Sequence, residues 1–319
     1  MESRHRVHVA VVDAAGRLVA RSGDPAFPTF LRSAAKPFQA WPVVADGAAD
    51  AWSMTPEELA LASSSHNSEP DQVKRIGALL ARLGLTESDL ACGPHRPLWQ
   101  ELAVRLPQDL DPEPVPRTPL SSNCSGKHTA MLALARHRQW ATAGYHEVTH
   151  PVQLRGRASL AHWAGIEPES IGSGVDGCGV ACFQIPLQAM ATAFARFGSA
   201  QDSAARRIAD AMTAHPRLVA GIGRLDTALM SAARGTVLSK VGADGVYGVA
   251  LRDRGLGIAL KVEDGHARAS MVGLIAVLRA LDVPAAAQPA LERYAGFTLY
   301  NTRAVSVGSL DPSGTLARL

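Results

Sequence analysis

Apolar residues follow a strand-like pattern at both ends of the chain and a helix-like pattern between them. Near the start, two strand-like segments flank a turn, and the same arrangement returns after residue 235, before a last apolar helix. These segments are Val7–Val12, Arg17–Ala20, Val246–Leu251, Gly257–Val262 and the helix Ala267–Leu281. The pattern predicts an α/β protein whose sheet is built from both chain ends, with a largely helical subdomain inserted.

The middle of the chain carries four further stretches with helical spacing of apolar residues: Asp71–Leu83, Lys127–Gln139, Pro151–Ala164 and Pro186–Phe197. Another helix should begin after Thr55, because threonine, proline and glutamate occupy the N-cap, first and third positions. The proline-rich stretch Pro107–Pro119 predicts a rigid loop. We expect one catalytic unit over residues 1–319, with residues 1–35 and 235–319 forming a sheet-containing subdomain and residues 36–234 a mainly helical one.

Composition narrows the class of partner. The 319-residue chain is 47% hydrophobic, which is ordinary for a globular protein, and its net charge is +3 with no tract of lysine and arginine. This pattern argues against nucleic acid or a membrane surface as a partner and favours a small-molecule substrate. The first residues lack the apolar core of a signal peptide, so we expect a cytoplasmic protein.

The first candidate chemistry is a serine and a lysine three residues apart, Ser33 and Lys36, on one face of a predicted helix. A lysine can remove a proton from a serine hydroxyl only if burial or a neighbouring cation lowers its pKa. Taken singly, such a pair is more often a surface lysine than a catalytic base. Further partners are therefore needed to support the catalytic interpretation.

Two later segments supply such partners in the order found in penicillin-recognising serine hydrolases. Ser65-His66-Asn67 fits the S-x-N element, and Lys240-Val241-Gly242 approximates the K-T-G element, with valine at the hydroxyl position. The alternative readings are a loop-capping serine for Ser65 and a surface lysine at a strand edge for Lys240. Three elements in the right order favour catalysis.

Two other motifs are misleading. The Gly126-Lys127 pair suggests a phosphate-binding P-loop, but Ser121 stands where its first glycine belongs and His128 where its serine or threonine belongs. Residues 146–150 read H-E-x-x-H, the pattern of zinc proteases. Because Pro151 follows directly and disfavours helical geometry before it, we reject the protease reading as well.

The four cysteines, Cys92, Cys124, Cys178 and Cys182, are read as free thiols or metal ligands rather than disulfides. By themselves they indicate buried thiols, because paired C-x₂-C knuckles are absent from the sequence.

Several longer sequence motifs together resemble those of the rhizobial-type (class 3) bacterial L-asparaginases, and the resemblance covers nearly the whole chain. The motifs are Arg32-Ser33-Ala34-Ala35-Lys36-Pro37-Phe38-Gln39-Ala40, Ser65-His66, Asn123-Cys124-Ser125-Gly126-Lys127-His128, His150-Pro151-Val152-Gln153 and Asp176-Gly177-Cys178-Gly179. The resemblance implies a β-lactamase-like fold, a homodimer and hydrolysis of L-asparagine to L-aspartate and ammonia.

The same resemblance implies two Ser-Lys pairs, Ser33 with Lys36 and Ser65 with Lys240. It also implies a Zn²⁺ site built from Cys124, Lys127 and Cys178, with Asp176 close by and available to the substrate. A lysine must be neutral to bind a metal, so Lys127 would need a strongly lowered pKa. Zinc there could hold the loops together or polarise the substrate carbonyl.

The substrate's charged groups need partners too. Arg32 is a candidate for the carboxylate because its planar guanidinium can bind bidentately, and His66 and Asn67 are candidate hydrogen-bond donors. We take Ser33 as the nucleophile, although the sequence does not decide between the two serines. Two other functions stay open: a penicillin-interactive, β-lactamase- or peptidase-like hydrolase with the same Ser-x-x-Lys machinery, and a catalytically silent zinc-binding protein.

Overall fold

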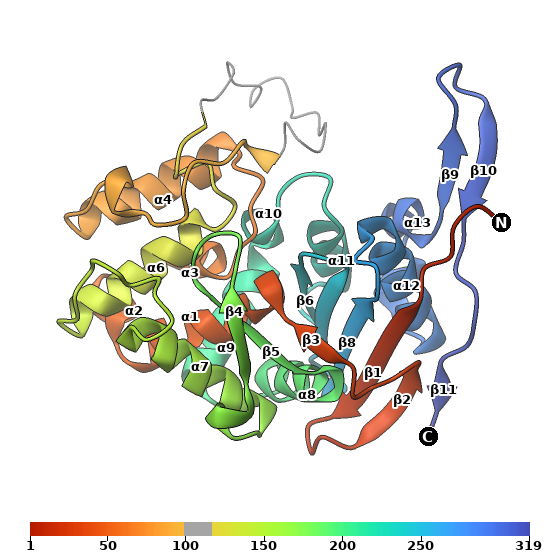
Figure 1. The fold of residues 1–319 in the computed structure, drawn as a ribbon, viewed down its shortest axis with the longest axis horizontal. Helices are drawn as coiled ribbons and strands as arrows, with labels where there is room; N and C mark the ends of the chain where they lie inside the picture. The colour runs from red at the N-terminus through yellow and green to blue at the C-terminus, as the bar shows by residue number, and fades with distance from the viewer. Residues whose placement is uncertain (99–116) are drawn as a thin grey trace.

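The first and last thirds of the chain meet in one antiparallel sheet. A computed structural model describes residues 1–98 and 117–319, and within this part six strands pair in the order β11-β2-β1-β8-β7-β6. Strand β1 (Val7–Asp13) pairs with β2 (Leu18–Ser22) on one side and with β8 (Leu256–Val262) on the other. Strand β6 (Val237–Gly242) pairs with β7 (Val246–Leu251) and forms an edge. The expected sheet from both chain ends is therefore confirmed (Figure 1).

The other strands are β3 (Pro28–Phe30), β4 (Gly172–Val175), β5 (Ala181–Pro186), β9 (Phe297–Tyr300), β10 (Ser306–Leu310) and β11 (Ala317–Arg318). The α-helices are α1 (Lys36–Ala45), α2 (Ala48–Ala51), α3 (Pro56–Ala62), α4 (Pro70–Arg82), α6 (Ser125–His137), α7 (Pro151–Ala164), α8 (Leu187–Gly198), α9 (Ser203–Ala214), α10 (Pro216–Val219), α11 (Leu225–Ala233), α12 (Ala267–Ala280) and α13 (Pro289–Ala295). The 3₁₀ helices are η1 (Arg32–Ala35), η2 (Glu87–Asp89), η3 (Pro168–Ser170) and η4 (Pro284–Ala287).

Helices cover both faces of the main sheet. Successive residues of a strand point to opposite faces, so one strand contributes side chains to two separate cores. In β1, Val9 and Val11 pack into the cluster that includes α11, α12 and α13. Ala10 and Val12 belong to the larger cluster on the other face, which includes α8. Strands buried on both sides read as continuous apolar runs, as β1 does.

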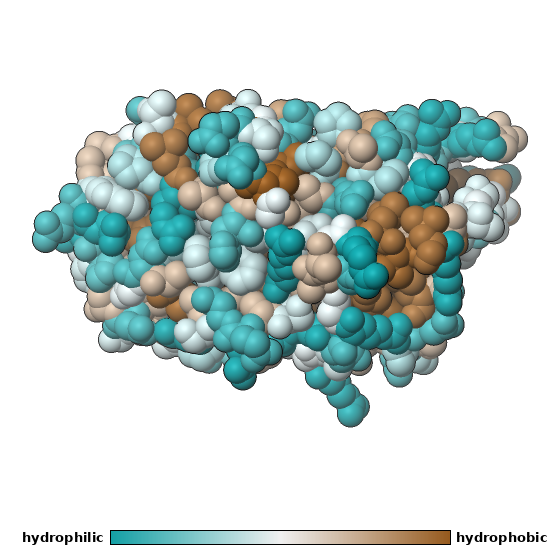
Figure 2. Space-filling model, turned by 90° about the horizontal axis from the view of Figure 1, so that it is seen from below, coloured by the Kyte–Doolittle hydropathy of each residue, from teal (hydrophilic) through white to brown (hydrophobic). Residues whose placement is uncertain are grey.

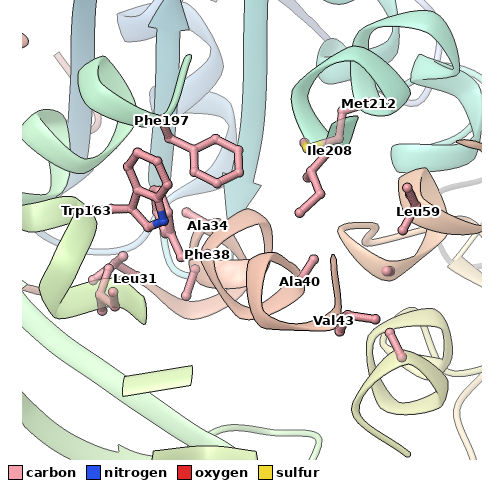
Figure 3. Close-up of a cluster of buried hydrophobic side chains, with 14 of the residues drawn as sticks. Leu31, Ala34, Phe38, Ala40, Val43, Leu59, Trp163, Phe197, Ile208 and Met212 are labelled. Carbon is pink, nitrogen blue, oxygen red and sulfur yellow. The ribbon is translucent and has the colours of Figure 1, made fainter. Parts of the chain in front are cut away.

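The inserted helices pack around α1, which carries Lys36 at its first residue. Phe38 on α1 makes an edge-to-face contact with Phe194 of α8. It also contacts Phe197 of α8 edge to face, and Trp163 of α7 contacts the same Phe197 (Figure 3). These aromatic contacts join the helical region to the helix that covers the sheet. The end of α1 that carries Lys36 is thereby anchored in the largest core of the protein.

The C-terminal region extends past the sheet. Strands β9 and β10 form a hairpin that projects from the body, and both chain ends lie on this side (Figure 1). Beside it, a groove of about 660 Å³ runs between α12 and residues 307–316. Figure 2 shows an apolar area bordered by polar residues toward this end of the molecule. None of the helices in the described ranges is both long and apolar enough to cross a membrane.

Most local expectations are confirmed within one or two residues. Helix α7 has the expected bounds, and Thr55 caps α3 in a capping box with Glu58. Helix α6 begins at Ser125 rather than at Lys127, so the glycine and lysine of that motif lie in its first turn. Of the proline-rich stretch 107–119, residues 107–116 lie outside the described part, so the rigid-loop prediction is not tested there.

Helix α8 approaches the sheet closely because Gly257 has no side chain. A Cβ atom at this position would lie 2.0 Å from the carbonyl oxygen of Ala191 and 2.5 Å from the backbone nitrogen of Ala195. We expect Gly257→Ala to lower the free energy of unfolding by about 1–3 kcal/mol, because the helix backbone must move away. Urea unfolding measures the change.

Gly77 provides the matched control, because it lies inside α4 and a Cβ there would meet nothing closer than Leu120 Cδ1 at 4.0 Å. Gly77→Ala should raise the free energy of unfolding by about 0.5–1 kcal/mol through helix propensity. Equal effects of the two substitutions would contradict the close-packing explanation.

Candidate active site

Three segments far apart in the sequence converge on the hydroxyl of Ser65. The N-terminus of α1 brings Lys36, the loop after α3 brings Ser65, and edge strand β6 brings Lys240. Ser65 Oγ lies 3.0 Å from Lys36 Nζ and 2.8 Å from Lys240 Nζ. The structure therefore brings both predicted lysines to one serine hydroxyl.

Both amines are enclosed by protein, with 1% of Lys36 and none of Lys240 exposed. Burial lowers the pKa of Lys36, and the nearby Lys127 lowers it further, although Cys124 acts in the opposite direction. Burial also lowers the pKa of Lys240 well below its ordinary value, assisted by Lys36. Lowered pKa values favour the neutral amine, which is the form that can accept a proton.

Backbone carbonyl groups complete the surroundings of the two amines. Lys36 Nζ donates to the carbonyl oxygens of Ser64 and Asn123, and Lys240 Nζ donates to that of Val241. Such neutral acceptors satisfy a buried amine without pairing it with a carboxylate. The arrangement suits a proton relay better than an ion pair.

Ser33 occupies a different position from Ser65. It lies in η1, one turn before Lys36, and is partly exposed. In the described part of the chain no hydrogen bond involves its hydroxyl, and Lys36 bonds to Ser65 instead. Ser33 is therefore the accessible hydroxyl of the pair, whereas Ser65 is 4% exposed and held between two amines.

The glycine of the Lys240-Val241-Gly242 element has a packing role. A Cβ on Gly242 would lie 2.6 Å from the carbonyl oxygen of Leu31, so only glycine lets η1 lie against the edge strand. The same closeness recurs at Gly126, where a Cβ would lie 2.3 Å from the carbonyl oxygen of Leu61. These two approaches bring Ser33 and the Cys124 loop beside the buried lysines.

His66 and Asn67 are both fully buried. Nε2 of His66 bonds to Ser125 Oγ at 2.9 Å, and its Nδ1 accepts the backbone N–H of Ser68. Burial, followed by the charge of Lys36, lowers the pKa of His66 to about 3, so the ring is neutral. In this structure the polar atoms of both residues are engaged by protein groups, and their contact with substrate stays a prediction.

Arg32 stands beside Ser33 but already has two carboxylate partners. Its Nε lies 2.8 Å from Asp176 Oδ1, and its Nη1 contacts Asp244. Its backbone has φ = 51°, a left-handed conformation uncommon outside glycine. Burial alone would raise the pKa of Asp176, but the charges of Lys127 and Arg32 outweigh it and lower that pKa. Substrate contacts of Arg32 and Asp176 stay predictions.

The three residues of the expected zinc site do come together. Lys127 Nζ lies 3.0 Å from Cys178 Sγ, the Cys178 thiol lies 3.8 Å from Asp176 Oδ2, and the Cys124 thiol donates to Asn123 Oδ1 at 3.0 Å. Interaction with Cys178, together with the charges of Lys36 and Lys127, lowers the pKa of Cys124, while the pKa of Cys178 is raised. Burial alone would lower the pKa of Lys127, but the two sulfurs outweigh it and raise that pKa.

The other two cysteines and the H-E-x-x-H segment are not part of the expected zinc site. Cys92 and Cys182 are free thiols whose pKa values burial raises to about 11. His150 caps α7 and bonds to the carbonyl oxygen of Ala141, so the H-E-x-x-H segment is not a helical metal site. In the described ranges, no group of three or more His, Cys, Asp or Glu residues is placed to hold a metal ion.

Sequence reasoning missed two charged residues at the site. Asp226, 1% exposed, accepts hydrogen bonds from Ser239 Oγ at 2.6 Å and from the backbone N–H of Val241 at 3.0 Å, on either side of Lys240. Arg224 donates to Asn67 Oδ1 at 3.1 Å and lies near the carbonyl oxygen of Ser65. The sequence signal that could have indicated a loop here is the pair of glycines in Gly221-Ile222-Gly223, just before Arg224.

Similarity to solved structures is distant. The native form of Mglu is 15% identical, with a TM-score of 0.48 over 87% of this chain and 64% of that one. The form of Mglu with tris and glutamate is 14% identical, with a TM-score of 0.48 over 88% of this chain and 60% of that one. The chain thus spans less than two thirds of the length of these structures.

Comparison of the sequence with known families gives a clearer result than the comparison of structures. None of the curated proteins matches the chain. The family model for L-asparaginase II matches residues 1–312, which is almost all of the 319-residue chain and includes every segment that meets at Ser65. The protein therefore belongs to the L-asparaginase II family.

Proposed function

We propose that this amidohydrolase cleaves the side-chain amide of L-asparagine to give L-aspartate and ammonia. The observation that carries the proposal is the sharing of Ser65 Oγ by the buried amines of Lys36 and Lys240, one helical turn from the accessible Ser33. Membership of the L-asparaginase II family supports an amide substrate. Amide hydrolysis needs a nucleophile, a base and an acid for the leaving ammonia, and this arrangement can supply all three.

In the first half of the reaction, Ser33 Oγ attacks the side-chain carbonyl carbon. Its proton passes to Lys36 Nζ, whose lowered pKa favours the neutral amine that can receive it. The C–N bond then breaks, and the protonated Lys36 returns the proton to the leaving nitrogen, which departs as ammonia. The product of this half is an ester between Ser33 and the β-carboxyl group of aspartate.

In the second half, water cleaves that ester. Ser65 connects Lys36 to Lys240, so a proton taken from the attacking water can move between the two amines through the Ser65 hydroxyl. The water oxygen forms the new bond to the acyl carbon, the bond to Ser33 Oγ breaks, and a proton returns to Ser33. L-Aspartate leaves and the serine is free again.

We also propose that Cys124, Lys127 and Cys178 hold Zn²⁺. Cysteine sulfur is a ligand that zinc prefers, Lys127 Nζ lies 3.0 Å from Cys178 Sγ, and three protein ligands would leave one position open. Binding of zinc by these residues would release the thiol protons that the cysteines still hold and one proton of the Lys127 ammonium group, so that Lys127 binds as a neutral amine. A bound zinc would act as a Lewis acid near the site. The homodimer and the cytoplasmic location stay predictions from the sequence.

Replacing each serine by alanine tests which serine attacks the substrate and which one relays protons. We expect Ser33→Ala and Ser65→Ala each to lower kcat for ammonia release from L-asparagine by at least about 10³-fold, because both belong to one relay. In Ser65→Ala, where water attack is impaired, acid quenching and peptide mass mapping should find an aspartyl adduct on the peptide that contains Ser33.

An adduct on the Ser65 peptide of the unaltered protein would contradict the assignment of the nucleophile. L-Glutamine and a chromogenic β-lactam serve as parallel substrates. Turnover or stable acylation by the β-lactam, with L-asparagine untouched, would favour the penicillin-interactive alternative. No turnover of any substrate, with zinc bound, would favour a silent metal-binding protein.

The lowered lysine pKa values predict a pH dependence. Below its pKa the base is protonated and inactive, so kcat/KM for L-asparagine should rise with pH and level off once the amine is neutral. Because burial lowers the pKa of Lys36, the midpoint should fall below 10.5, the ordinary lysine value. Far-UV circular dichroism over the same range controls for unfolding, and a midpoint at or above that value would argue against Lys36 as the base.

Metal analysis tests the zinc proposal. We expect about one zinc per chain by mass spectrometry, and Cys124→Ala should remove it. Cys182→Ala is the matched control, because both thiols are 5% exposed and Cys182 lies outside the cluster. Equal zinc content in the two variants, or none in the unaltered protein grown with zinc, would contradict the proposal.

A further inference from the structure

Two arginines flank the proposed catalytic groups, and their surroundings differ. Arg32 is ion-paired with Asp176 and Asp244, so its charge is already compensated by two carboxylates. A third carboxylate at Arg32 would meet two like charges. Like charges in one site repel each other, which makes Arg32 a poor partner for an anionic substrate group unless those pairs separate.

Arg224 has no such compensation. Its acceptors are the side-chain oxygen of Asn67 at 3.1 Å and the carbonyl oxygen of Ser65 at 3.5 Å, both neutral. Within the described ranges, no Asp or Glu carboxylate lies within ion-pair distance of its guanidinium. A guanidinium with only neutral acceptors keeps its full charge and open donor positions for an incoming anion.

The loop that carries Arg224 is held firmly against Ser65. The backbone N–H of Ser65 donates to the carbonyl oxygen of Val219, and Glu69 accepts the backbone N–H of Ile222 at 2.6 Å. Gly221, with φ = 123°, lies so close to Asn67 that a Cβ there would be 2.3 Å from its Nδ2. Arg224 is then the N-cap residue of α11, half-buried beside the relay.

The proposed relay creates a need for such a cation. Lys36 and Lys240 can act as bases only while neutral, so neither can also neutralise the α-carboxylate of an amino-acid substrate. The influence of Arg224 reaches the relay, since its charge contributes to the lowered pKa values of His66 and Lys240, behind burial and Lys36. Arginine stays charged under all these conditions.

We propose that Arg224 binds the α-carboxylate of the substrate and so selects amides that belong to free α-amino acids. The inference rests on the proposed function, because it names the group that recognises that substrate. In this role Arg224 determines specificity and takes no part in proton transfer.

A pair of substrates isolates this role. 3-Aminopropanamide is L-asparagine with hydrogen in place of the α-carboxylate, and it keeps the amine and the amide that reacts. We expect Arg224→Met to lower kcat/KM for L-asparagine at least about 100-fold, while kcat/KM for 3-aminopropanamide changes less than about threefold. The preference for the carboxylated substrate should therefore collapse. A merely structural role would reduce both substrates by the same factor.

Two further variants keep the test decisive. Arg224→Lys retains the charge but loses the planar fork, so the preference should fall by about tenfold, and this variant serves if the methionine variant does not fold. Arg32→Met is the matched control and should affect both substrates alike. If Arg32→Met loses the preference for L-asparagine over 3-aminopropanamide while Arg224→Met keeps it, the inference is wrong and Arg32 is the residue that binds the carboxylate.

Calorimetric binding of L-aspartate repeats the comparison without turnover. Its Kd should rise at least about 30-fold in Arg224→Met, whereas the Kd of β-alanine should stay within about threefold. If the unaltered protein hydrolyses L-asparagine and the Arg224 variants keep its preference, the inference alone fails. If the unaltered protein releases no ammonia from L-asparagine, the proposed function fails and the inference falls with it.

Discussion

The burial of two lysine amines against one serine hydroxyl is the constraint on which the rest of the site depends. A buried amine is costly when charged, so Lys36 and Lys240 are driven toward the neutral form and must still find hydrogen-bond partners. The chain meets this need with backbone carbonyl groups from three separate segments. Those segments must be held in place, and much of the surrounding packing does so. The same burial that lowers stability is what makes the lysines usable as bases.

Close backbone contacts hold the segments together. Gly242 lets η1 lie against the edge strand β6, and Gly126 lets the first turn of α6 lie against the end of α3. Asp226 then fixes the strand from the other side by bonding on both flanks of Lys240. Residues from Leu61 to Glu69 are all buried, and the polar side chains of residues 64–69 have hydrogen-bond partners inside the protein, whereas Ser63 Oγ has none among the described residues. Rigid support of this kind suits a relay whose donor–acceptor distances must stay short.

The permanent positive charges at the site are carried by side chains other than the two relay lysines. Lys127 is paired with the sulfurs of Cys124 and Cys178, and Arg32 is paired with two carboxylates. Arg224, by contrast, has only neutral acceptors among the described residues, Asn67 Oδ1 and the carbonyl oxygen of Ser65. This distribution separates three tasks that one lysine could not perform together: proton transfer, metal or thiolate binding, and recognition of an anionic substrate group.

The sequence by itself determined the elements and the candidate chemistry, because both depend on local patterns. Apolar periodicity predicted the bounds of α7 and placed the strands of the β1–β2 hairpin to within two residues, the capping residues predicted the start of α3, and ordered motifs singled out the serines and lysines. Only the tertiary structure decided that Lys36 hydrogen-bonds to Ser65, that Arg32 is paired with two carboxylates and that Arg224 has no carboxylate partner within residues 1–98 and 117–319. Lys240 and Ser65 are 175 positions apart, and no local pattern encodes which distant side chains meet or how deeply they are buried. Burial and partners set a side chain's charge, so its chemical role emerges only once the chain is folded.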